Sequence, residues 1–167
     1  MRPVVIIGVG NVYRRDDGVG VAVVQRLRET GLPDWVTSAV SDGEPAQLVE
    51  LWSRTELAIV VDALAVRAAI PGAVHRIEID AVEGVHAPSA SSHGLGLGTA
   101  ARLARELGRL PERLIVYAVE ISEYAFGDRM SPAVASAAEH IAEHVEADLA
   151  DFEAALRSLP PVATGER

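Results

Sequence analysis

The chain contains no cysteine, few aromatic residues and no long uninterrupted apolar run. The absence of cysteine excludes disulfides, thiolate metal sites and a cysteine nucleophile. Aromatic residues make up 4% of the 167 residues although 49% are hydrophobic, so the core must be built from valine, leucine, isoleucine and alanine. The longest apolar stretch, residues 57–66, contains Asp62 and is too short to span a bilayer.

Basic residues are also in the minority, with 15 against 24 acidic residues and a net charge of −9. No basic cluster stands out, which argues against binding to a nucleic acid backbone. We expect no signal peptide in the first residues, because glycines interrupt their apolar run almost at once. We therefore expect a cytoplasmic protein, a monomer, that binds neither nucleic acid nor membrane.

Apolar runs alternate with amphipathic segments along the chain, which is typical of an α/β domain with a parallel sheet. We expect strands at residues 4–8, 35–41, 57–63, 73–79 and 114–119, and helices at 18–29, 45–52, 94–107 and from 132 onward. The run 73–79 alternates apolar and polar residues, which favours an edge or antiparallel strand. The prediction is one domain, residues 1–158, with the order β-α-β-α-β-β-α-β-α, followed by a disordered tail, 159–167.

The first strand and helix contain the most informative motif. The strand ends in the turn Gly8-Val9-Gly10-Asn11, and Asp16 and Asp17 follow at the start of the helix. Glycine-rich turns at this place usually bind phosphate through the amides and the positive dipole end of the helix. Two carboxylates at that positive end would repel an anion, so the motif predicts a site for a cation.

Three candidate metal ligands follow different strands. Asp17 comes after the first strand, Asp62 ends the third, and His93 precedes the helix that follows the fourth. Because ligands of open α/β sheets bind beyond the carboxyl ends of the strands, we expect these side chains to meet. Two carboxylates and one imidazole suit a divalent ion such as nickel, zinc, manganese or iron.

Each candidate also has a structural interpretation. Asp17 can be a helix N-cap, although Asp16 can cap as well and leave its neighbour free. Asp62 can be satisfied by a hydrogen bond to Asn11 or to backbone amides, but an unpaired buried charge is costly. His93 can be a surface histidine; at a helix N-terminus, however, the dipole favours its neutral, metal-binding form.

Two further motifs are weaker. Asp42 ends the second strand, where dinucleotide-binding proteins place the acid that holds a ribose, but Tyr13 stands where their third glycine is needed. His140, Glu143 and His144 form the H-x-x-E-H motif of inverted zinc peptidases. These side chains fall off the apolar stripe of their helix, and only 23 residues follow His144 to supply a further acidic ligand. We interpret them as a solvated helix face.

The combination GVGNVYRRDDGVG, IVVDA and SSHGLGL, with DGEPAQLVELW after the second strand, resembles the hydrogenase maturation endopeptidases. The resemblance covers residues 2–155. It implies a three-layer α/β fold, a twisted five-stranded, mostly parallel sheet with helices on both faces. It also implies that Asp17, Asp62 and His93 are the metal ligands, with Asp17 standing where some members have glutamate.

The activity implied by the resemblance is one cut that releases a C-terminal extension from the precursor of a nickel-iron hydrogenase large subunit. The cut follows nickel insertion, and the enzyme senses nickel carried by the precursor. The competing hypothesis is a non-catalytic metal-handling module that docks on the precursor without cutting it. The loop 122–130, with Tyr124 and Phe126, either sets partner choice or packs over the sheet edge.

Overall fold

The computed structural model describes residues 4–80 and 94–158. It contains the strands β1 (Val4–Val9), β2 (Val36–Ser41), β3 (Leu57–Ala65), β4 (Val74–Asp80) and β5 (Arg113–Ile121), and the helices α1 (Val19–Thr30), α2 (Pro45–Trp52), α3 (Gly94–Glu106) and α4 (Pro132–Ser158). All nine expected elements are confirmed, with ends displaced by one or two residues at most. A short 3-10 helix, η1 (Arg15–Gly18), precedes α1 and was not expected. The expected disordered tail lies outside the described residues.

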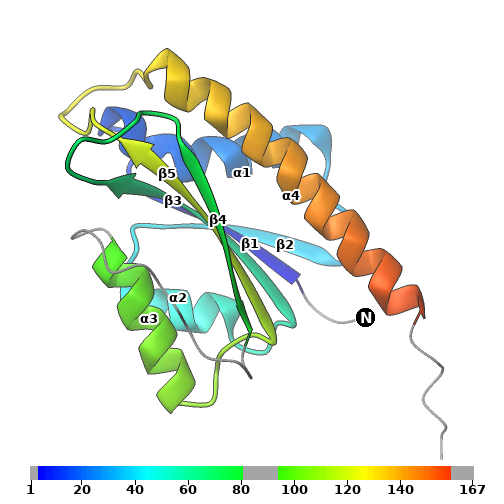
Figure 1. Cartoon of the computed structure of the whole chain (residues 1–167). Coiled ribbons are helices and arrows are strands. Elements are labelled where there is room, and N and C mark those ends of the chain that lie inside the picture. The colour runs from blue at the N-terminus through cyan, green and yellow to red at the C-terminus, as the bar shows by residue number, and fades with distance from the viewer. Residues whose placement is uncertain (1–3, 81–93, 159–167) are drawn as a thin grey trace, which may run out of the picture.

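The five strands form one sheet in the order β2-β1-β3-β5-β4 (Figure 1). Neighbouring strands are parallel, except that β4 runs antiparallel to β5 at the edge. This confirms the mostly parallel sheet and the edge position expected for residues 73–79. Gly8 of β1 pairs with Val61 of β3, so the carboxyl ends of these two strands lie together.

Helices cover both faces of the sheet: α1 and α4 pack on one, α2 and α3 on the other (Figure 1). The predicted stripe of α4 faces the core, where Val134, Ala138, Ile141, Val145, Leu149 and Phe152 are buried and Leu156 is partly buried. His140, Glu143 and His144 are exposed, as expected for a solvated face. Within residues 4–80 and 94–158, no helix combines the length and apolarity needed to cross a membrane.

Helix α1 packs unusually closely on the sheet because glycines face each other at the contact. A Cβ atom added to Gly20 would lie 2.3 Å from the Val61 carbonyl oxygen and 2.5 Å from that of Val9. A Cβ atom on Gly8 would lie 2.3 Å from the Gly20 carbonyl oxygen. Only glycine therefore fits at both positions, and their contact fixes the start of α1 directly above the ends of β1 and β3.

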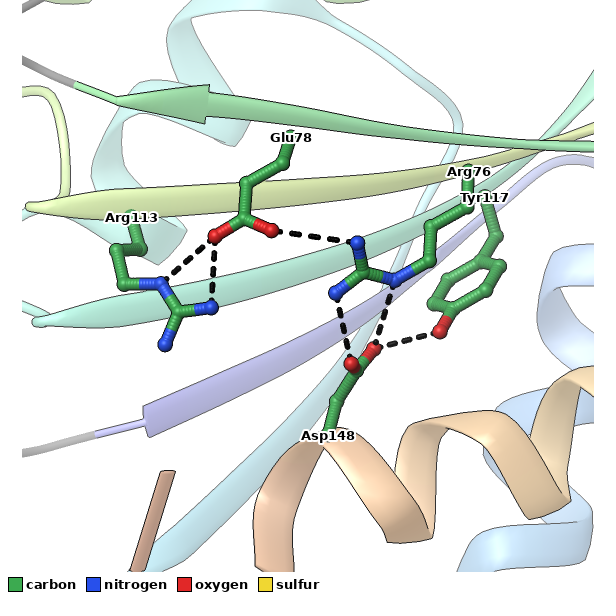
Figure 2. A network of polar contacts seen from close by, with 5 residues as sticks. All are labelled: Arg76, Glu78, Arg113, Tyr117 and Asp148. Atoms are coloured by element: carbon green, nitrogen blue, oxygen red, sulfur yellow. Dashed lines mark hydrogen bonds and ion pairs between the residues drawn. The ribbon is translucent and has the colours of Figure 1, made fainter. Parts of the chain in front are cut away.

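A polar network ties α4 to β4 and β5 (Figure 2). The Arg76 guanidinium donates to Asp148 of α4, with a shortest distance of 2.7 Å, and to Glu78 at 3.2 Å. Arg113 donates to Glu78 at 2.7 Å, and the Tyr117 hydroxyl donates to Asp148 at 2.5 Å. Burial of the Tyr117 ring raises its pKa above the usual range, so the hydroxyl stays protonated and keeps donating.

Candidate active site

A cleft of about 250 Å³ opens beyond the carboxyl ends of β1 and β3. Its walls come from the turn between β1 and α1, Asp62 of β3, the segment after β2 and the first turn of α3; β3 continues to Ala65, so Asp62 does not end the strand as expected. The lining residues are Val9, Gly10, Asn11, Arg14, Asp17, Asp42, Gly43, Asp62, Gly96 and Leu97. This is the edge of the sheet at which the sequence predicts the ligands to meet.

Asp17 lies in η1 and is buried in the wall of the cleft. Its Oδ2 atom accepts a hydrogen bond of 3.1 Å from the Asn11 backbone N–H. Gly10 makes this arrangement possible: its φ is +140°, and a Cβ atom there would lie 1.9 Å from the Asp17 carbonyl oxygen. Gly18, and not Asp17, occupies the N-cap position of α1, so the helix-cap interpretation of Asp17 is wrong.

Asp16 has a different role from its neighbour. Its side chain is fully buried and accepts two hydrogen bonds from Ser131, 2.6 Å from the backbone N–H and 2.9 Å from the hydroxyl. Its own backbone N–H donates to the Glu123 carbonyl oxygen at 3.0 Å. Asp16 therefore joins η1 to the start of α4 and does not cap α1.

Asp62 lies in β3, paired with Ala118 of β5, and is 7% exposed. The pKa of its carboxyl is raised to about 7, chiefly by burial; a hydrogen bond from the Ala63 backbone lowers it, and the charge of Asp17 adds to the increase. The sequence suggested that Asp62 bonds either to a backbone amide or to Asn11. The backbone bond from Ala63 is present, whereas the Asn11 backbone N–H donates to Asp17. The charge of Asp17 acts on Asp62, so the two carboxylates repel each other when both are ionised. A cation bound between them would reduce this repulsion.

His93 lies outside the described residues, so its place relative to the two carboxylates stays a prediction. The next residue begins α3, and Gly96 and Leu97 in the first turn of that helix line the cleft. Gly96 allows this approach, because a Cβ atom there would lie 2.7 Å from the Gly43 carbonyl oxygen. Among residues 4–80 and 94–158, no three histidine, aspartate or glutamate side chains are placed to hold a metal ion together.

Two residues of the cleft, Asp42 and Arg14, were not included in the site predicted from the sequence. Asp42 lines the cleft and accepts a 3.1 Å hydrogen bond from the Glu44 backbone N–H, whereas the sequence suggested only a weak ribose-binding role for it. Arg14 also lines the cleft, and its Nε atom donates to the Tyr124 carbonyl oxygen at 3.2 Å. Asp42 directly follows β2, so the rule that pointed to Asp17 and Asp62 identifies it as well.

Comparison with known proteins identifies the family to which the chain is similar. The family model of the HycI hydrogenase maturation proteases matches residues 21–148. The chain is 28% identical to the hydrogenase 2 maturation protease of Escherichia coli (strain K12) over 119 residues, which are 70% of this chain and 71% of that protein. It is also 28% identical over 155 residues to the hydrogenase expression/formation protein HupD of Thiocapsa roseopersicina, covering 84% of this chain and 68% of that protein.

Solved structures show the same fold. The hydrogenase maturating endopeptidase HybD from E. coli superimposes with a TM-score of 0.77 at 26% identity, covering 91% of this chain and 94% of that chain. The hydrogenase maturation protease HybD from Thermococcus kodakarensis shares the fold at 23% identity and a TM-score of 0.65, covering 87% of this chain and 97% of that chain. The chain thus belongs to the hydrogenase maturation protease family, and it is an endopeptidase of hydrogenase maturation.

Proposed function

We propose that this endopeptidase removes the C-terminal extension from the large-subunit precursor of a nickel-iron hydrogenase after nickel insertion. It recognises nickel in the precursor through Asp17, Asp62 and His93. The observation that carries the proposal is the pair of carboxylates, Asp17 and Asp62, which share one cleft at the carboxyl ends of β1 and β3. The named activities of the relatives support the choice of substrate.

The donor set fits a divalent transition ion. Carboxylate and imidazole ligands suit nickel, zinc, manganese and iron, and open coordination positions leave room for groups of the substrate. Burial and the charge of Asp17 raise the pKa of Asp62, so a cation in the cleft would offset an electrostatic cost that the folded protein already bears. The nickel arrives with the precursor as part of the substrate, and other divalent ions are able to replace it.

The residues of the cleft have separate tasks in this proposal. When bound, the nickel of the precursor would anchor the scissile segment and polarise its carbonyl group. A carboxylate of the cleft, Asp17 or Asp62, would take a proton from the attacking water and return it to the leaving amine.

The proposal is tested with the variants Asp17→Asn, Asp62→Asn and His93→Ala. Each is incubated with nickel-loaded precursor, and mass spectrometry measures release of the extension. We expect cleavage to fall at least about 100-fold in each variant, because each removes a nickel ligand or a proton-transfer group of the site. Asp34→Asn is the control, since Asp34 is exposed and precedes the amino end of β2, away from the cleft.

The outcomes separate the parts of the proposal. Normal cleavage by all three variants would overturn the assignment of the site. Calorimetric titration with nickel chloride measures metal binding independently of cleavage, and affinity should fall in all three. Nickel-dependent association with a precursor whose mass never changes would support a metal-handling module in place of a peptidase acting on this substrate.

A further inference from the structure

Four large apolar side chains are exposed beside the cleft. Val12 and Tyr13 come from the turn between β1 and η1, and Tyr124 and Phe126 come from the segment between β5 and α4. Phe126 is 88% exposed and Tyr13 is 67% exposed. We call these four residues the aromatic lip. Aromatic groups exposed together on a protein surface are typical of an interaction site.

The lip is held in place by hydrogen bonds between its two segments. The Arg15 N–H donates to the Gly127 carbonyl oxygen and the Gly127 N–H donates to that of Tyr13, both at 2.9 Å. The Arg14 guanidinium donates to the Tyr124 carbonyl oxygen and lies 6.0 Å from the centre of its ring. Figure 1 shows the segment that leads from β5 into α4 beside the turn before α1. These bonds fix the backbone of both segments, so binding need not order that backbone.

The lip and the cleft are parts of one continuous surface. Asn11 and Arg14 line the cleft, and Val12 and Tyr13 lie between them in the chain. The cleft itself, at about 250 Å³, is smaller than most sites for small ligands, which measure roughly 300–1,000 Å³. It has room for the reacting group and little more of a polypeptide. Selection of one substrate by an endopeptidase therefore needs contacts outside the cleft.

We propose that the aromatic lip binds an apolar, non-acidic segment of the substrate polypeptide next to the bond that is cut. The chain is an endopeptidase, so the occupant of its cleft is a polypeptide, and a chain that leaves the cleft past Asn11 and Arg14 meets the lip. The cleft wall holds three aspartates, Asp17, Asp42 and Asp62, against the one arginine Arg14 among its described residues, and this excess of acidic groups disfavours an acidic segment at the entrance. The identity of that polypeptide as a hydrogenase large-subunit precursor rests on the proposed function.

The test compares Phe126→Ala, alone and with Tyr13→Ala, with the unmodified protein. Initial rates on the nickel-loaded precursor give kcat and KM, and surface plasmon resonance gives the Kd of the precursor. We expect KM and Kd to rise about 10-fold or more with kcat unchanged, as for exposed aromatic anchors of interfaces. The affinity for nickel chloride should not change.

Leu107→Ala is the matched control. Leu107 is 54% exposed and follows the carboxyl end of α3, ten residues beyond Leu97 of the cleft, or roughly 15 Å along a helix axis. Its removal should leave KM and Kd as they are. An equal effect in this variant would mean that loss of any exposed apolar group weakens binding, and would overturn the proposal.

Other results have equally definite meanings. Unchanged KM and Kd in the double variant would overturn the role of the lip. So would a dimer in sedimentation that Phe126→Ala dissociates, because the lip would then bind a second copy of the chain. If Asp17→Asn and Asp62→Asn cleave normally while the lip variants still weaken precursor binding, the lip stands and the metal-recognition proposal fails.

Discussion

Replacement of Asp62 by asparagine tests the electrostatics of the cleft apart from catalysis. The substitution keeps the shape of the side chain, and its amide oxygen is able to accept the hydrogen bond that the Ala63 backbone makes to Asp62. It removes the carboxylate that burial and Asp17 disfavour. We expect the metal-free variant to be more stable than the unmodified protein at pH 8, although it no longer processes the precursor.

The magnitude follows from the two pKa values of Asp62. Its carboxyl titrates near the ordinary value of 3.8 in the unfolded chain and at about 7 in the folded protein. Between these values the folded state holds a proton that the unfolded state has lost, so stability falls as pH rises, by about 1.4 kcal/mol per pH unit. The full interval corresponds to at most about 4 kcal/mol, and we expect the variant to gain about 2–4 kcal/mol at pH 8.

Urea denaturation in the presence of EDTA measures this difference. The variant and the unmodified protein should have nearly equal free energies of unfolding at pH 4, and the advantage of the variant should grow until about pH 7 and then level off. Saturating nickel chloride should narrow the gap by stabilising only the protein that retains Asp62. An advantage that is constant with pH, or a less stable variant at pH 8, would refute the reasoning.

Two further predictions concern the contacts that hold the site in place. Gly20→Ala should destabilise the protein by about 1–3 kcal/mol, because the new Cβ would lie 2.3 Å from a backbone oxygen of β3. Gly98→Ala in α3 meets nothing within 4 Å and should stabilise it by about 0.5–1 kcal/mol; urea denaturation measures both. Tyr117→Phe should lower the free energy of unfolding by about 1.5–3 kcal/mol, since it removes a hydrogen bond to the carboxylate of Asp148. Urea denaturation measures this change as well.

The outcomes that would contradict these predictions are specific. Equal effects of the two glycine substitutions would mean that helix propensity, and not the contact of α1 with the sheet, governs position 20. A phenylalanine variant as stable as the original would mean that the link between α4 and β5 does not depend on the Tyr117 hydroxyl. Precursor cleavage by the Tyr117 variant should remain normal, because this hydroxyl lies outside the cleft.

Hydrophobic periodicity alone predicted the nine elements, their order and the edge position of β4. This prediction succeeded because the spacing of apolar residues within one segment shows which face of the helix or strand is buried, and that spacing is visible in the local sequence. The order of elements also placed Asp17 and Asp62 at one edge, because right-handed β-α-β connections bring the carboxyl ends of parallel strands together. The sequence therefore determined the fold class and the position of the cleft.

The sequence selected Asp17 as the candidate ligand through the family resemblance, but only the tertiary structure showed what Asp16 does instead. The two residues are chemically identical and adjacent, yet Asp16 binds Ser131, 115 residues away, while Asp17 lines the cleft. The raised pKa of Asp62 and the hydrogen bonds between the two segments of the aromatic lip also come from tertiary contacts. Each depends on the register of the strands and on the close approach of α1 at Gly20, which bring together groups from distant parts of the chain. Local patterns carry no information about such distances, so packing decided them.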